Sequence, residues 1–188
     1  AATAQAGPVL SPLTADETAD VVVIGAGFTG LSTAIHLREM GVGVTVVEAV
    51  EPGWGASGRN NGQVIPTLAG HDPSGMTARH GAAGERFNAV LRDAAQHLFD
   101  TVRKYDIPAE AEQAGWVQPV HSPGRFKIAE KRVKEWSALG APVELLDREA
   151  MARMLGSDAW FGGFWNRTGG HVNPLALARG LAEVALRL

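Results

Sequence analysis

Three glycines and one glutamate near the start of the chain have the types and spacing of a nucleotide-binding turn. Gly25, Gly27 and Gly30 form a GxGxxG pattern within "VVVIGAGFTGLSTAIHLREMGVGVTVVEA", residues 21–49. In this pattern the first glycine permits a tight turn, the second lets the backbone approach a pyrophosphate, and the third lets a helix pack on a strand. Glu48 follows, and its carboxylate can accept hydrogen bonds from ribose hydroxyls while repelling a 2′-phosphate. The four residues predict a dinucleotide site that disfavours NADP.

The segments around these residues have the patterns of a βαβ unit. "DVVVIG" predicts a parallel strand buried on both faces, and "VGVTVVE" predicts a second buried strand. Between them, "GLSTAIHLREM" predicts a helix whose inward stripe is Leu31, Ala34 and Ile35. The N-terminus of that helix would offer free amides and a positive dipole end to a phosphate. The alternative is a glycine-rich turn that arose by chance in another α/β protein. It does not account for the two strands, the helix, the glycines and the glutamate occurring together.

The next segment separates flavin from nicotinamide. Residues 51–64, "EPGWGASGRNNGQV", are here called the glycine-rich loop. In a nicotinamide dehydrogenase the second strand usually leads quickly into another amphipathic helix. This loop instead offers backbone amides, a hydroxyl and a guanidinium to a pyrophosphate or to the edge of a flavin ring. A solvated surface loop rich in turn-forming residues remains the alternative.

The βαβ segment followed by "GASGRNNGQV" resembles FAD-dependent oxidoreductases of the D-amino-acid oxidase and glycine oxidase type, most closely the gamma-glutamylputrescine oxidase-like amine oxidases. The corresponding family loop reads S-G-R-N-G-G-Q, so Asn61 stands where the family usually has glycine. Asparagine tolerates a positive φ better than most residues, which would let the loop keep its conformation. The resemblance covers nearly all of this chain and about the N-terminal half of the family's length.

The resemblance also implies roles for individual residues. The pyrophosphate would be wrapped by the turn, Glu48 would hold the adenosine ribose, and the loop would run from the phosphates towards the isoalloxazine. The implied cofactor-binding residues are Gly25, Gly27, Phe28, Thr29, Gly30, Glu48, Ser57, Gly58, Arg59, Asn60, Asn61, Gly62, Gln63 and Val64. Some relatives attach the flavin through His or Cys. Because this chain has no cysteine and no histidine in the loop, we expect non-covalent FAD.

The activity that the resemblance implies is oxidation of an amine or amino acid at its C–N bond, with hydride transfer to flavin N5 and electrons passed on to oxygen or a carrier. The flavin carries out the difficult step and the protein supplies orientation and electrostatics, so no catalytic residue is assigned. A cofactor-binding module that is inactive without a C-terminal half is a second hypothesis. An NAD-dependent dehydrogenase is a weaker third.

The remaining segments predict connecting helices and the start of another domain. A helix is expected over residues 84–107, with an inward stripe of Phe87, Val90, Leu91, Ala94, Leu98 and Val102. "GWVQPVHS" predicts an extended segment placed at a sheet edge by Pro119. Further helices are expected in residues 123–140, with Val133, Trp136 and Leu139 inward and Gly140 at the C-cap, and in residues 148–155, with Asp147 as N-cap; "PVELL" predicts a strand between them. A last helix is expected with Asn173 as N-cap and Pro174 at its first position.

These segments predict an α/β fold: a Rossmann-like FAD-binding βαβ unit with helices, plus the beginning of an α+β substrate domain. The expected ranges are an N-terminal arm over 1–19, the first part of the FAD-binding domain over 20–84, a helical and substrate-domain portion over 85–170, and a helix returning to the FAD domain over 171–188. One βαβ unit cannot complete a doubly wound sheet, so the fold is expected to be incomplete without a C-terminal half or a second chain.

Composition narrows the remaining possibilities. A net charge of -3 gives no electrostatic case for binding nucleic acid. Residues 1–20 lack the basic and apolar regions of a signal peptide, and no apolar run approaches the ~20 residues of a membrane span, so a cytoplasmic protein is expected.

No metal site is expected, since His71 and His80 flank a predicted loop without convergent ligands. His171 is the best histidine for a pocket role, and Trp54 could form a pocket wall beside the loop.

Overall fold

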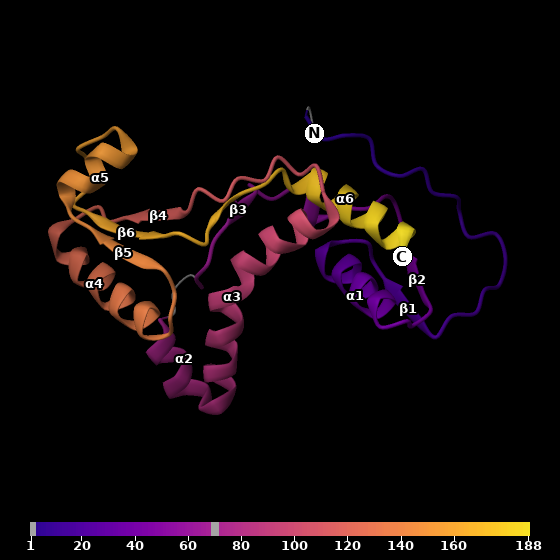
Figure 1. The fold of residues 1–188 in the computed structure, drawn as a ribbon, viewed down its shortest axis with the longest axis horizontal. Helices are drawn as coiled ribbons and strands as arrows, with labels where there is room; N and C mark the ends of the chain where they lie inside the picture. Colours follow the sequence, from indigo (N-terminus) through magenta and orange to yellow (C-terminus); the bar gives the residue numbers. More distant parts are fainter. Residues whose placement is uncertain (1–2, 69–71) are drawn as a thin grey trace. The chain divides into compact units, whose positions relative to one another are not determined.

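The computed structural model describes residues 3–68 and 72–188. Helices and strands are intermixed along them in a mixed α/β architecture, as the sequence predicts (Figure 1). In chain order the elements are β1 (Val21–Ile24), α1 (Phe28–Glu39), β2 (Val44–Val47), the 3-10 helix η1 (Ala56–Gly58), β3 (Gln63–Val64), α2 (Pro73–His80), α3 (Ala82–Tyr105), β4 (Trp116–Pro119), α4 (Pro123–Ala138), β5 (Val143–Leu146), α5 (Arg148–Leu155), β6 (Gly163–Asn166), β7 (Gly170–His171) and α6 (Pro174–Arg187). Across the described ranges, no helix combines the length and apolarity needed to cross a bilayer.

The chain divides into two compact units. The first unit contains the chain up to Gly62 together with Thr101–Ala111 and Val172–Leu188, and the second contains Gln63–Asp100 and Glu112–His171. Both units are therefore assembled from separate stretches of sequence. The functional domain ranges 1–19, 20–84, 85–170 and 171–188 remain predictions.

The first unit contains the expected βαβ arrangement. β1 and β2 pair in parallel, with Val21 opposite Val44 and Ile24 opposite Val47. Helix α1 buries Leu31, Ala34 and Ile35, which confirms the predicted inward stripe. Helix α1 also packs against α6, so two helices that are distant in sequence lie together in this unit (Figure 1).

The prediction that β1 is buried on both faces is wrong. Val22 is 58% exposed and Ile24 is 88% exposed, whereas their neighbours in the strand are half-buried. Side chains of a strand alternate between the two faces of the sheet, and Val23 faces α1, where its Cγ1 lies beside Gly30. Within the described residues the sheet has two strands, and its second face has no covering element.

The second unit is built on an antiparallel sheet of order β4-β6-β5. Its core contains Val120, Ala129 of α4 and Phe164 of β6, with Trp116 of β4 and Phe126 packed against them. β4 is an edge strand, as Pro119 predicts, because proline cannot donate a ladder hydrogen bond. A short antiparallel pair, β3 with β7, belongs to the same unit.

Several predicted helix ends are confirmed. The Asp147 side chain accepts from the Ala150 amide at 2.8 Å and caps α5. Asn173 accepts from the Ala176 amide at 3.1 Å and caps α6, with Pro174 in the first turn. Gly140 follows α4 with a φ of 85°, the left-handed conformation expected after a helix end.

The predicted inward stripe of α3 is largely wrong. Phe87 is 40% exposed and Val90 is 68% exposed. Helix α2 forms where a loop around His80 is expected, and Gly84 faces it: a Cβ on Gly84 would lie 2.3 Å from the Met76 carbonyl oxygen. The positions buried along α3 are Gly84, Asn88, Ala95, Phe99 and Val102, whereas Ala94 is exposed and Leu91 and Leu98 are half-buried.

Charged side chains join α2 to α4 in the second unit. The Asp72 carboxylate accepts hydrogen bonds from Lys131 and Arg132, both at 2.8 Å. Glu135 accepts from the Ser74 amide at 3.0 Å. Partial burial alone would raise the pKa of Asp72, but the two cationic donors outweigh it and hold the pKa below its ordinary value. Asp72 is therefore ionised at neutral pH and supports the contact between the two helices.

We expect Asp72→Asn to lower the free energy of unfolding at pH 7 by about 1 kcal/mol, because the partly exposed pairs are screened by solvent. Because folding lowers the pKa of the Asp72 carboxyl, its ionisation stabilises the fold at pH values above the ordinary pKa of 3.8. This stabilisation is lost as the pH falls through the pKa of the folded protein. Denaturant unfolding should therefore show the difference between the two proteins shrinking as the pH falls below 3.8. Asp93→Asn is the matched control, since Asp93 is exposed and pairs with its chain neighbour Arg92. Equal effects of the two substitutions would contradict the assignment.

Candidate functional site

The turn between β1 and α1 has the conformation that its glycines were predicted to allow. Gly25 has a φ of 99°, and its amide donates to the Val47 carbonyl at 2.7 Å. An ideal Cβ on Gly30 would lie 2.0 Å from the Gly25 carbonyl oxygen, a distance that real atoms do not adopt. The turn therefore brings the start of α1 against the end of β1 more closely than any side chain permits.

The N-terminus of α1 presents amides that the helix itself cannot satisfy. Gly27 is the N-cap and has no side chain to accept a hydrogen bond, and the Phe28 amide donates to the Ser57 hydroxyl oxygen at 3.0 Å. Within residues 3–68 and 72–188, no acceptor is assigned to the amides of Thr29 and Gly30. Free amides together with the positive end of the helix dipole favour an anionic group here.

Glu48 meets this turn from the end of β2. Its Oε2 accepts from the Ala26 amide at 2.8 Å, and its Oε1 accepts from the Val50 amide at 3.2 Å. The bond from Ala26 is the main cause that lowers the pKa of Glu48 below its ordinary value. The carboxylate is ionised at neutral pH, and its remaining lone pairs are able to accept from hydroxyl groups.

The glycine-rich loop makes several contacts within itself. The Asn60 side chain donates to the Ser57 carbonyl at 2.9 Å and accepts from the Gly62 amide at 2.9 Å. A Cβ on Gly58 would lie 2.2 Å from the Gly53 carbonyl oxygen. These contacts fold the segment into a compact turn around η1, although residues 54–56 and 59–61 remain exposed to solvent.

Asparagine at position 61, where the family usually has glycine, suggested a positive φ there, but Asn61 does not have one. Among the residues that the structure describes, only Asp106 and Glu110 combine a positive φ with a side chain. The left-handed position in this part of the loop is Gly62, with a φ of 74° and with the Val172 carbonyl oxygen 2.2 Å from where a Cβ would stand. Asparagine at position 61 therefore causes no backbone strain of this kind.

Arg59 and Trp54 form a cation–π pair on the loop. The Arg59 guanidinium lies 4.4 Å from the centroid of the Trp54 ring. Trp54 is 49% exposed, so its ring is open to solvent as well as to Arg59. Contacts of this kind hold a guanidinium without neutralising its charge. A role of Trp54 as a pocket wall stays a prediction.

Helix α6 packs directly against the loop, and sequence reasoning missed this contact. The Ala178 Cβ lies 2.7 Å from the ideal Cβ position of Gly53, and the Leu175 Cδ1 lies 2.9 Å from that of Gly58. Both loop positions must be glycine for the helix to approach so closely. The small residues of "NPLALARG", residues 173–180, were the available signal.

The structure thus brings most of the predicted cofactor residues together in the first unit: Gly25, Gly27, Phe28, Thr29, Gly30, Glu48, Ser57, Gly58, Arg59, Asn60, Asn61 and Gly62. Gln63 and Val64 form β3 in the second unit, where they pair with His171 and Gly170. His171 Nε2 lies 3.6 Å from Glu112 Oε2. His71 lies outside the described residues, and the described ones hold no group of three potential metal ligands.

The chain is similar to proteins of known sequence. A profile of the family described as FAD dependent oxidoreductase (DAO) matches residues 20–188. Gamma-glutamylputrescine oxidoreductase of Escherichia coli is 34% identical over 173 residues, which cover 91% of this chain and 40% of that protein. A probable oxidoreductase, OrdL of Haemophilus influenzae, is 32% identical over 179 residues, which cover 94% of this chain and 41% of that protein. The chain therefore spans about two fifths of the length of these curated relatives.

Solved structures share the fold at low sequence identity. L-Amino acid deaminase from Proteus myxofaciens matches with a TM-score of 0.79 at 20% identity, over 98% of this chain and 40% of that one. L-Proline dehydrogenase from P. horikoshii matches with a TM-score of 0.73 at 20% identity, over 91% and 42% of the two chains. Glycine oxidase from Geobacillus kaustophilus gives 0.67 at 20% identity, over 89% and 44%.

The close approach at the turn leads to a test of its geometry. We expect Gly30→Ala to lower the free energy of unfolding by about 1–3 kcal/mol, because the new methyl group must push α1 away from the Gly25 carbonyl. Gly75→Ala is the control: it lies within α2 with nothing within 4 Å of a Cβ, so it should stabilise by up to about 1 kcal/mol. Denaturant titrations followed by circular dichroism measure both. An unchanged stability of Gly30→Ala would show that the turn can relax without cost.

Proposed function

The chain belongs to the FAD-dependent oxidoreductase (DAO) family, and on this premise we propose that it forms the first part of the flavin site of an enzyme that oxidises an amine or amino acid at its C–N bond. The observation that supports this best is the ionised Glu48 carboxylate bonded to the Ala26 amide beside the open N-terminus of α1. An acceptor for hydroxyls and donors for phosphate are thereby placed side by side, as a dinucleotide requires.

The pyrophosphate of FAD would lie at the turn. The amides of Thr29 and Gly30 would donate to it, and the positive end of the α1 dipole would favour its charge. The Ser57 hydroxyl accepts from the Phe28 amide with its oxygen, which leaves its own hydrogen free to donate to a phosphate. Glycine at Gly27 keeps this approach open, because a Cβ there would lie 2.9 Å from the Ser57 Oγ.

Glu48 would hold the adenosine ribose. Its carboxylate already uses one lone pair of each oxygen on backbone amides and keeps the others for the ribose hydroxyls. Its negative charge would repel a 2′-phosphate, which favours FAD over NADP.

The loop would continue from the phosphates towards the isoalloxazine. Arg59, which lies over the Trp54 ring, would supply a positive charge to the phosphates, and Asn60 keeps the following turn at Gly62 closed. Asn61, Gln63 and Val64 remain proposed contacts of the ring system. The chain has no cysteine, so we propose non-covalent attachment.

Hydride acceptance at flavin N5 is the chemistry that bound FAD would supply, with electrons then passed to oxygen or to a carrier. The residues described here would bind and orient the cofactor. No residue of this chain is assigned a proton transfer, because a neutral amine can be oxidised without a protein acid or base. A cytoplasmic location is proposed with this activity.

An alternative within the same family is a cofactor-binding module that requires additional polypeptide for activity. It rests on the exposed face of β1, at Val22 and Ile24, and on the two-fifths coverage of the curated relatives. Apolar strand faces are normally covered in a parallel sheet. We propose that a C-terminal half, or a second chain, covers this one and completes the substrate site.

The proposed function predicts that the full-length protein releases FAD on denaturation and that amines or amino acids bleach its flavin absorbance under anaerobic conditions. The 188-residue segment, tested in parallel with added FAD, should show weak flavin binding and no turnover. A nicotinamide nucleotide in place of flavin would contradict the cofactor assignment. Robust turnover by the segment would reject the need for further polypeptide.

For Glu48 we expect Glu48→Ala to weaken FAD binding by roughly tenfold to a hundredfold, because hydrogen bonds to a charged group are lost. Glu48→Gln keeps an acceptor without the charge and should lose less. Equilibrium titration of apoprotein with FAD, followed by flavin fluorescence, separates the variants. An unchanged dissociation constant for Glu48→Ala would show that Glu48 does not contribute to FAD binding and is only a charged residue at the end of β2.

A further inference from the structure

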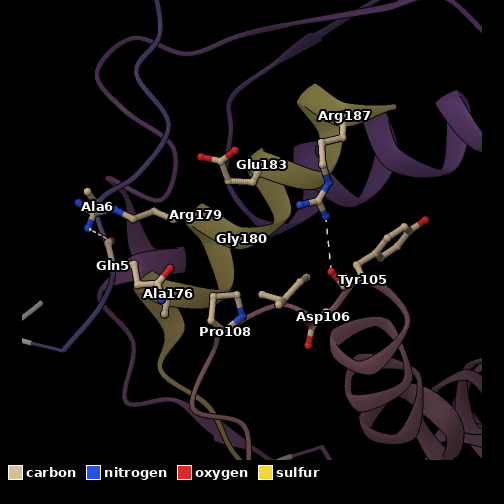
Figure 2. A pocket seen from close by; sticks show the side chains of 11 residues that line it. Gln5, Ala6, Tyr105, Asp106, Pro108, Ala176, Arg179, Gly180, Glu183 and Arg187 are labelled. Carbon is tan, nitrogen blue, oxygen red and sulfur yellow. Dashed lines mark hydrogen bonds between the residues drawn. The ribbon is translucent and has the colours of Figure 1, made fainter.

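The N-terminal arm, defined here as residues 3–19, has no helix or strand and lies outside the range that the family profile matches. It is nevertheless attached to α6 at two places. Asn173, the N-cap of α6, donates from Nδ2 to the Thr3 hydroxyl at 3.0 Å. Arg179 donates from Nη1 to the Gln5 carbonyl at 2.8 Å, as Figure 2 shows. The first residues of the arm therefore follow α6 from its cap to its second turn.

Arg179 is enclosed between the arm and the glycine-rich loop. Its side chain is 20% exposed, its Nη2 lies 3.8 Å from Glu51 Oε2, and its buried Nε has no partner among the described residues. Gly7 of the arm lies against its aliphatic stem, since a Cβ there would stand 3.2 Å from the Arg179 Cγ. One guanidinium thus contacts the backbone of the arm and the first residue of the loop.

The helix that carries Arg179 is also the support of the loop. Ala178, the residue before Arg179, packs on Gly53, and Leu175 packs on Gly58. The arm and the loop are therefore both attached to α6, in one compact unit. A shift of α6 or of Arg179 would be transmitted to the segment from Gly53 to Gly58 because its backbone has no spare room.

A cavity of about 290 Å³ lies under the arm and is lined by the arm, the end of α3 and α6 (Figure 2). Its charged lining includes Asp106 and Glu183 as well as Arg179 and Arg187. The balanced charges select no ligand, so we interpret the cavity as space left where the arm crosses α6.

We propose that Arg179 is a positioning residue that couples the N-terminal arm to the glycine-rich loop and so preorganises the loop for FAD. The inference rests on the proposed function, because it assigns the loop to flavin binding. A loop held in place before binding loses less conformational freedom when the ligand arrives, which raises affinity. The arm, through Arg179, then contributes to cofactor affinity without touching the cofactor.

The test uses the full-length protein and three changes: Arg179→Met, deletion of residues 1–7, and both together. Arg187→Met is the matched control, since Arg187 lies on the same helix but contacts the Tyr105 carbonyl, at 3.5 Å. Arg179→Lys is the conservative variant, able to retain one of the two contacts. For each protein we measure the dissociation constant for FAD, hydrogen exchange of peptides covering residues 51–62 without FAD, and the thermal midpoint.

We expect Arg179→Met and the deletion each to raise the dissociation constant by at least about fivefold and to accelerate exchange in residues 51–62. Arg187→Met should change neither quantity, Arg179→Lys should be intermediate, and the double change should be less than additive. Unchanged FAD affinity and unchanged exchange in the single variants would overturn the proposal, as would equal effects from Arg187→Met. If the wild-type protein binds no FAD, the proposed function fails, whereas the exchange data still decide whether the arm holds the loop.

Discussion

The hydrogen bond from the Ala26 amide to the Glu48 carboxylate links the two strand ends on which the candidate site depends. Parallel pairing of β1 with β2 brings these ends to the same edge of the sheet, and the bond from Gly25 to Val47 closes the pairing beyond the last residue of β1. Separation of the ends would leave an ionised carboxylate without its donor, which is unfavourable for a partly buried charge. The hydrogen bond from the Phe28 amide to the Ser57 hydroxyl oxygen then holds the start of α1 against the glycine-rich loop.

Features governed by short-range chemistry could be predicted from the sequence. Asp147 and Asn173 are caps because each side chain reaches an amide three residues further along. Pro119 lies in an edge strand because it lacks an amide hydrogen. The need for glycine at position 30 follows from the same local geometry, since the turn and the helix start are only a few residues apart.

Features that depend on distant neighbours could not be predicted in the same way. The apolar pattern of α3 favours Phe87 and Val90 as inward residues, yet contact with α2 buries Gly84 and Asn88 instead. Asn88 is polar, but its burial is compensated because its side chain donates to the Pro73 carbonyl at 3.0 Å. The contact between the loop and α6 could not be predicted from the loop sequence alone, because the contacting residues of α6 lie more than one hundred positions away.

The interleaving of the two units has a consequence for the order of events during synthesis. All residues assigned to the second unit precede Val172, whereas the first unit includes α6. Glu48 and the glycine turn are translated well before the α6 surface on which Gly53 and Gly58 rest. Domains usually fold as units while the chain is being made. Here the nucleotide-binding turn must wait for α6, so the nascent chain passes through a period in which this turn exists without the support for its loop.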